Sequence, residues 1–291
     1  MTQRLSDVEA RISTVHQLET VIAAMRGIAA ARSREARARI DGIRTYARSV
    51  GAAIGEALAF LPQQPPAPAA AEDSSPDGAS RGTVVLALCA EQGFVGSFNS
   101  HVLDRVATLG NASAHNLLLV GDRGLMAAGE RDVKVAWSAA MVSHANEVPA
   151  LANRIADALY QRIEAGAARV QLVHAVPDHL QGEMNDQSVV VHQLVPFDFG
   201  RFPVSRRAVA PLITLPPQLL LAQLAQEFVF AEICEALMLS FSAENEARMQ
   251  AMIAATNNVR RRREELLGDY RRLRQEGITN EVIELAASRV T

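Results

Sequence analysis

The chain has 291 residues, of which 49% are hydrophobic, 21% charged and only 4% aromatic. This composition excludes a disordered chain, and the scarcity of aromatic residues favours packed helices over an all-β fold. The net charge is only −3, but residues 1–60 carry nine Arg against six acids and residues 244–291 nine Arg against eight acids, whereas residues 61–243 carry eleven basic and eighteen acidic residues. A partner of the two basic ends should therefore present an acidic surface.

Several classes of function are disfavoured by single residue types. Lysine occurs once, at Lys134, which argues against lysine-based catalysis. Cys89 and Cys234 lie far apart in sequence, so they match no metal or redox spacing and are predicted to be buried structural thiols in a reducing compartment. The N-terminus lacks the apolar segment of a signal peptide. The most apolar stretch, residues 215–241, contains two prolines and three glutamates and is unsuited to crossing a membrane.

Residues 1–61 contain no proline and are predicted to form one long helix. Their apolar residues recur at alternating steps of three and four, as in the contact line of a coiled coil, hereafter the seam. The predicted seam begins with Leu5, Val8, Ile12, Val15, Leu18, Ile22, Met25 and Ala29. At 1.5 Å per residue this helix would be roughly 80 Å long, too long to be covered by a single compact domain.

The middle of the chain has a different pattern. Residues 62–82 are rich in Pro and Ala and are predicted to form an exposed linker. Residues 83–200 alternate between apolar runs and helical patterns, which predicts a Rossmann-like α/β domain with a mainly parallel sheet. Strands are expected at 83–90, 116–121, 133–137 and 169–176, an edge strand at 187–196, helices at 100–109 and 148–164, and a turn at 122–124.

A second long helix is predicted for residues 217–291, after a connector at 201–216. No proline follows Pro217, and the helical spacing of apolar residues continues to about Ala287. Two long seams at opposite ends of one chain can bury each other. The predicted fold is therefore an antiparallel coiled coil of the N- and C-terminal helices with the α/β domain inserted between them.

The turn after the first strand, Gly93-Phe94-Val95-Gly96, lies where a doubly wound fold binds phosphate. It lacks the third glycine of the dinucleotide-binding fingerprint, no acid-ended second strand matches the ribose-binding position, and no phosphate-binding loop with Gly-Lys-Ser/Thr occurs anywhere. A structural turn is the better interpretation. The domain is therefore predicted to have a nucleotide-binding fold without nucleotide, cofactor or catalytic residues.

Two further groups of residues have both a functional and an ordinary interpretation. His174 and His179, with Asp178 and Glu183 nearby, could hold a metal ion, but the better prediction is solvent-exposed loop histidines and no metal site. The arginines at 32, 34, 37, 39, 44 and 48 could form a solvated face, dock on an acidic protein or bind nucleic acid. The first is favoured, the second comes next, and nucleic acid comes last because only Tyr46 is available for stacking.

Both ends of the chain are similar to the γ subunit of F-type ATP synthases. The resemblance rests on RISTVHQLETVIAAMRGIAAARSREA (11–36), ENEARMQAMIAATNN (244–258) and YRRLRQEGITNEVIEL (270–285), while the middle matches in organisation. These are long motifs in the family's order, so the resemblance covers nearly the whole chain.

The resemblance implies a rotor shaft that performs no bond chemistry of its own. In the family, the paired helices stand inside a ring of three α and three β subunits, and the α/β domain sits beside the ε subunit on the membrane c-ring. Ion flow turns the ring and the shaft, which drives each β catalytic site through its conformations. The chain is then expected at the cytoplasmic face of the bacterial cell membrane, bound only through the complex, and without contact to nucleic acid.

The resemblance also implies contact residues. Met25 and Arg26 match the family's N-terminal segment that meets the acidic lever of β. Arg274, Gln275 and Thr279 match positions that engage the catch loops of β. Val282, Ile283 and Leu285 are expected to form an apolar bearing surface at the tip.

Departures from the family pattern indicate a divergent bacterial branch. The two lysines usual before Ala-Met are absent, and Ala90-Glu91-Gln92-Gly93 replaces the usual Ser-Asp-x-Gly. The second, N-type ATPase of some bacteria is one candidate for this branch. Two other classes of protein compete with the rotor shaft: a non-rotary coiled-coil adaptor, and a doubly wound enzyme with a helical arm. The missing phosphate loop counts against the enzyme and the end motifs count against the adaptor.

Overall fold

The computed structural model describes residues 2–61, 82–109, 116–177, 188–205 and 211–288, and the side chains of residues 4–283 within them. The predicted linker therefore lies almost wholly outside the described residues. The chain divides into two compact units. We call Ala31–Ala247 the central unit, and Met1–Ala30 with Arg248–Thr291 the terminal unit. Among the described helices, none combines the length and hydropathy that a membrane span requires.

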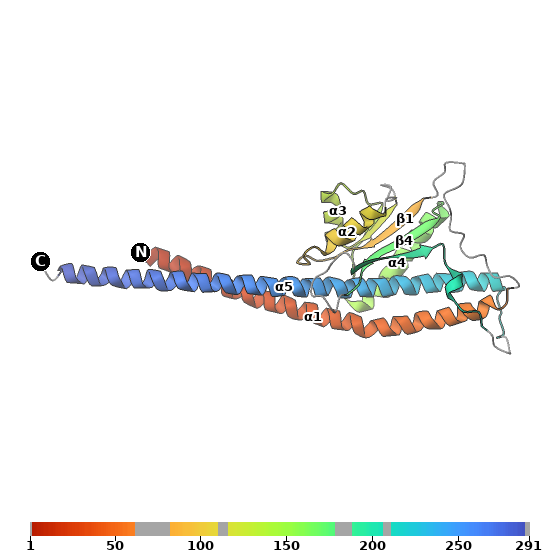
Figure 1. The fold of residues 1–291 in the computed structure, drawn as a ribbon, viewed down its shortest axis with the longest axis horizontal. Helices are drawn as coiled ribbons and strands as arrows, with labels where there is room; N and C mark the ends of the chain where they lie inside the picture. Colours follow the sequence, from red (N-terminus) through yellow and green to blue (C-terminus); the bar gives the residue numbers. More distant parts are fainter. Residues whose placement is uncertain (1, 62–81, 110–115, 178–187, 206–210, 289–291) are drawn as a thin grey trace. The chain divides into compact units, whose positions relative to one another are not determined.

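Two helices account for nearly half of the chain (Figure 1): α1 (Thr2–Leu58) and α5 (Pro217–Ser288). Side-chain pairs between them show that they run antiparallel, because the partners on α5 descend as the positions on α1 ascend. In the central unit, Ser33 meets Ser242 and Arg44 meets Glu235. In the terminal unit, Glu19 meets Arg263. The predicted antiparallel pairing of the two terminal helices is confirmed.

The inserted domain contains a five-stranded sheet of order β3-β2-β1-β4-β5. The strands are β1 (Thr83–Leu88), β2 (Leu117–Val120), β3 (Trp137–Ala139), β4 (Arg169–Ala175) and β5 (Val189–Val195). The first four are mutually parallel, and β5 pairs antiparallel with β4 at one edge. The predicted Rossmann-like domain is confirmed. The segment predicted as an edge strand is β5, which does lie at the edge of the sheet.

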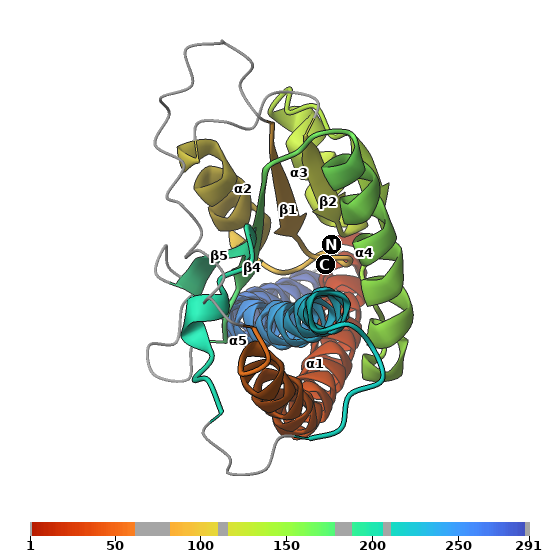
Figure 2. The ribbon, with the colours of Figure 1, turned by 90° about the vertical axis from the view of Figure 1, so that its right-hand side faces the viewer.

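Helices cover both faces of this sheet (Figure 2). One face packs on α2 (Phe98–Thr108) and α3 (Asp122–Glu130) through Val85, Ala87 and Cys89. The other face packs on α4 (Val148–Glu164) and α5 through Val84, Leu86 and Leu88. Successive residues of a strand point to opposite faces, which explains why nearly every residue of β1 is apolar and buried.

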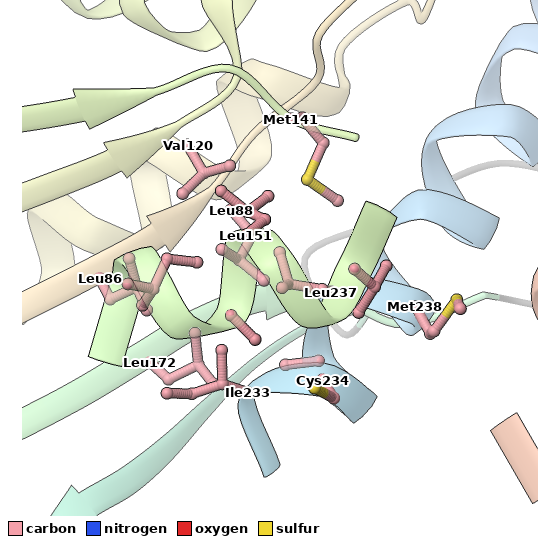
Figure 3. Packing of buried hydrophobic residues seen from close by; sticks show 14 of the residues in the cluster. Leu86, Leu88, Val120, Met141, Leu151, Leu172, Ile233, Cys234, Leu237 and Met238 are labelled. Carbon is pink, nitrogen blue, oxygen red and sulfur yellow. The ribbon is translucent and has the colours of Figure 1, made fainter. Parts of the chain in front are cut away.

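The larger of the two cores joins the domain to the long helices. Figure 3 shows Leu86 and Leu88 of β1 and Leu172 of β4 packed with Leu151 of α4 and with residues of α5. Ile233 and Leu237 of α5 are fully buried there, and Ala36 and Ile40 of α1 belong to the same cluster. The sheet therefore rests directly on the helical pair within the central unit.

Three local predictions were wrong. The turn expected at Asp122-Arg123-Gly124 is the first turn of α3, which begins immediately after Gly121 with its positive φ of 107°. The strand expected at 133–137 is instead β3, Trp137–Ala139, which pairs with Leu118–Val120 of β2. The seam residue Leu18 is 48% exposed, whereas the side chain of Glu19 is only 19% exposed and lies 3.5 Å from Arg263. The seam therefore passes through Glu19.

Candidate functional site

The contact residues implied by the sequence all belong to the terminal unit. Met25 and Arg26 lie on α1, and the others lie near the end of α5. In α5, the buried Leu266 and the half-buried Tyr270 and Leu273 mark the seam that faces α1. Away from this seam, most side chains of α5 between residues 271 and 283 are exposed, and no other described residue buries them.

The exposed surface at the end of α5 consists of two adjacent rows of residues four positions apart. The first row contains Arg274, Ile278 and Val282, and the second contains Gln275, Thr279 and Ile283. Residues four apart share one face of a helix, so each row runs along the helix surface from a polar side chain to an apolar one. We call this surface the two-row face.

The apolar members of the two-row face are strongly exposed. Val282 and Ile283 are each 59% exposed, and Ile278 is 54% exposed. The sequence-based site omitted Ile278, although its position four residues after Arg274 and four before Val282 could have revealed it. Leu285 follows Val282 by three positions, close to the end of the first row, but its side chain lies outside the described side chains. Large apolar side chains gathered on one helix face are typical of surfaces that bind another protein.

Arg274 is available to bind a partner. Its neighbours Arg262, Arg263 and Arg272 are paired, at 2.8 Å from Glu265, 3.5 Å from Glu19 and 3.0 Å from Asp269. Arg274 has no hydrogen bond or ion pair with any residue that the structure describes. Thr279 is held locally, since its hydroxyl donates to the carbonyl oxygen of Gln275 over 2.9 Å. An unpaired guanidinium beside apolar side chains can take a carboxylate in bidentate fashion.

A second exposed apolar row lies on α1. Leu18, Val21 and Ile28 are about half exposed, and the half-buried Met25 lies between them at helical spacing. Arg26 is exposed and, among the described residues, has no ion-pair partner. Met25 and Arg26 were predicted as contact residues, whereas Leu18 was assigned to the seam and Val21 and Ile28 were not singled out. The terminal unit thus has an exposed apolar row with a neighbouring free arginine on each of its helices.

The arginines of the first helix in the central unit are mostly paired within the chain. Arg37 binds Glu246, and Arg44 lies 2.8 Å from Glu235 on α5. Arg39 lies 3.4 Å from Glu35, Arg48 donates to Thr45, and Arg32 donates to Gln92 in the loop after β1. The favoured prediction of a merely solvated face was therefore incomplete, because several of these arginines link α1 to α5 or to the domain.

The carboxyl end of the parallel sheet is occupied by a side chain of the chain itself. Glu91 follows β1, and its Oε2 accepts the backbone N–H of Met141 at 2.7 Å and of Asp122 at 3.2 Å. Asp122 is the first residue of α3, and helix N-termini at this edge are the places where doubly wound folds hold phosphate. The turn beside it contains Phe94 at φ 61° and Gly96 at φ 57°. The Glu91 carboxylate therefore binds backbone N–H groups that a nucleotide-binding domain would leave free to bind phosphate.

The prediction of a solvent-exposed loop histidine was wrong for His174. This residue belongs to β4, is 2% exposed and stacks on His192 of β5 with ring centres 5.4 Å apart. Burial lowers the pKa of His174 to about 4. His179, Asp178 and Glu183 lie outside the described residues, and within the described ones no group of three potential metal ligands gathers. Cys89 and Cys234 are buried free thiols, as predicted, and burial raises the pKa of each to about 12.

Comparison with known proteins places these features in a family. A family model described as ATP synthase matches residues 4–289. The ATP synthase gamma chain of Salinibacter ruber is 28% identical, over 97% of this chain and 96% of the relative. The ATP synthase gamma chain of a Ruegeria species is also 28% identical, over 97% of each chain.

Solved structures share the fold. A chain from the Euglena gracilis mitochondrial ATP synthase, in the assembly of OSCP, F1 and c-ring, superposes with a TM-score of 0.64 at 13% identity over 100% of this chain and 95% of that one. A chain from the central stalk and c-ring of the Tetrahymena thermophila mitochondrial ATP synthase gives a TM-score of 0.53 at 19% identity, over 81% of this chain and 99% of that one. The paired terminal helices and the inserted sheet are therefore an arrangement found in these assemblies.

Proposed function

The chain belongs to the ATP synthase family, and we propose that it is the gamma subunit, the rotor shaft of an F-type ATP synthase or ATPase. It would couple ion translocation through a c-ring to ATP synthesis or hydrolysis at the catalytic sites of the beta subunits. The observation that carries this proposal is the family match, which runs through both long helices and the domain between them. The gamma-chain names of relatives that span 97% of this chain support the same assignment.

The proposed partners are three alpha subunits, three beta subunits, an epsilon subunit and the c-ring. The structural relatives come from assemblies whose descriptions name F1, the c-ring and the central stalk. The basic ends of the chain suit acidic partner surfaces, as expected if they stand among beta subunits. Through such a complex the chain would lie peripherally at the cytoplasmic face of a bacterial cell membrane.

We place the beta-subunit contacts on the terminal unit. Arg274 would pair with a carboxylate of a beta loop, Gln275 and Thr279 would add polar contacts, and Met25 with Arg26 would meet beta from α1. Support comes from the exposure of these groups and from the unpaired state of Arg274 and Arg26 among the described residues. Val282, Ile283 and Leu285 would form the apolar bearing at the tip.

The shaft would act without catalytic groups of its own. A single asymmetric helical pair inside a ring of three equivalent beta subunits meets each of them with a different face. Contacts that favour the open state of one site and the closed state of another shift the populations of those states. The carboxylate of Glu91 in the phosphate position of the α/β domain is consistent with this non-catalytic role.

Reconstitution tests the proposed function directly. Alpha and beta subunits of the same complex are purified and their ATP turnover is measured with and without this chain. We expect the chain to join the assembly at one copy per three beta subunits and to raise steady-state turnover. Equal turnover in its absence would contradict the rotor shaft.

The contact residues can be tested separately with a matched control. Arg274→Ala with Gln275→Ala removes the polar end of the two-row face, and we expect turnover in the assembly to fall several-fold. Arg272→Ala removes an arginine two positions earlier that is already paired with Asp269, and we expect turnover to stay near the unsubstituted rate. If the double variant is as active as Arg272→Ala, the proposed contact is wrong even though the shaft assignment stands.

A further inference from the structure

An apolar pocket of about 130 Å³, partly open to solvent, lies in the central unit where α4, the edge of the sheet and α5 meet. Ala156 on α4 and Ala225 on α5 lie in its wall, and larger side chains at these two positions would fill part of the space. The buried Leu194 of β5 lies in its wall, together with Val229 of α5. The cavity takes no part in the proposed rotor contacts, which all belong to the terminal unit.

The chemistry of the cavity determines what it can hold. No polar atom faces it, so a water molecule at its inner end would find no hydrogen-bond partner in the wall. Two aromatic rings, those of Tyr160 and Phe197, stand in the wall. Aromatic rings pack favourably edge-to-face with a further ring. An engineered apolar cavity of about 150 Å³ binds benzene, so the volume of this pocket suits a ligand of that size.

We propose that this cavity is a binding site for a small aromatic hydrocarbon the size of a benzene ring. The ligand contacts α4, the sheet and α5 at once, so it favours the state in which the long helix is packed on the domain. Binding to the folded state alone raises the thermal stability of that state.

Benzene titration of the purified full chain tests the site. The chain carries ¹³C-labelled alanine and valine methyl groups, and the resonances of Ala156 and Val229 are followed as benzene is added. We expect these two methyls to shift saturably and the melting temperature to rise with benzene concentration. Lining methyls that do not respond, or respond without saturation, overturn the proposal.

Cavity-filling variants supply the matched control. Ala225→Leu places three more carbon atoms in the space and should weaken benzene binding at least about tenfold. Ala222→Leu makes the same change at an exposed position of the same helix and should leave the affinity unchanged. Equal affinity of the two variants contradicts the site. If Ala225→Leu does not fold, the smaller change Ala156→Val takes its place with the same expectation. These measurements need no other subunit, so they leave the rotor proposal untouched whichever way they fall.

Discussion

Gly124 of α3 packs directly against Cys89 at the end of β1, so closely that a β-carbon at position 124 would overlap the Cβ atom of Cys89 and lie 2.7 Å from its Sγ atom. Both residues are buried in the smaller of the two domain cores, between the sheet and α3. Only a glycine allows the helix to approach the sheet so closely. The close approach also holds the N-terminus of α3 next to Glu91.

Gly124→Ala should therefore destabilise the central unit by about 3 kcal/mol, because rigid backbone and a buried side chain must move apart. Thermal unfolding measures the change. Gly129→Ala is the control, since a β-carbon at that position of the same helix meets nothing within 4 Å. It should be neutral or slightly stabilising. In the double variant with Cys89→Gly, the penalty of Gly124→Ala should shrink, and an unchanged penalty would show that the overlap is not its cause.

Glu91→Ala should cost about 1 to 3 kcal/mol, because it leaves the N–H of Met141 without its acceptor at a partly buried position. Glu91→Gln retains an acceptor oxygen and should cost less. Glu130→Ala, at the exposed end of α3, serves as the control and should change stability little. Denaturant unfolding distinguishes the three. The proposed structural role of Glu91 fails if Glu91→Ala is no less stable than Glu130→Ala.

Stability should fall as the pH drops from about 6.5 to about 4, because of His174. Burial, with a smaller contribution from the neighbouring His192, lowers the pKa of His174 to about 4 in the folded chain, against an ordinary value of 6.5. Between these pH values His174 is protonated in the unfolded chain but not in the folded chain. The free energy of unfolding therefore falls by on the order of 3 kcal/mol across this interval. His174→Gln removes this titration, so its unfolding free energy should depend less steeply on pH in the same interval. Parallel curves for the two proteins would contradict the assignment.

Arg201 should be more important to stability than an ordinary surface arginine. Its guanidinium carbon lies 4.7 Å from the ring centre of Phe228 and 5.3 Å from that of Phe202, and it pairs with Glu232 at 2.5 Å. Arg201→Ala should lower the free energy of unfolding by about 2 kcal/mol, and Arg201→Lys by about half as much, because lysine keeps the charge but loses the planar stacking. Arg154→Ala on the exposed side of α4 is the control. Chemical denaturation would refute this role if Arg201→Ala matched the control.

Much of the fold could be predicted because its signals are local. A proline-free run with apolar steps of three and four indicates a long helix, and β1 and β2 are almost continuous apolar runs of strand length. The errors arose where tertiary contacts decide. Leu18 and Glu19 both fit the spacing of the seam, and the choice depends on Arg263, 244 positions away. Asp122-Arg123-Gly124 has turn residues, but Glu91 and the close contact with Cys89 turn it into the start of a helix.

The candidate contact residues came from a family resemblance, and the periodicity alone could not have supplied them. The structure adds information that the resemblance does not contain, namely which of the candidate side chains form ion pairs within the chain. Arg272 and Arg274 look equivalent in sequence, yet only Arg272 is paired among the described residues. Ile278 was missed because the family resemblance did not single it out, although its spacing from Arg274 and Val282 places it on their helix face.

Single-molecule rotation tests the central claim most directly. Assemblies of alpha, beta and this chain are fixed to a surface through the beta subunits, and a probe is attached to the α/β domain through a cysteine at the exposed Phe94 position. During ATP hydrolysis we expect the probe to rotate in one direction with three dwell positions per turn, one for each beta subunit. A probe that stays fixed while the same assemblies hydrolyse ATP would contradict the rotor shaft and favour a non-rotary adaptor.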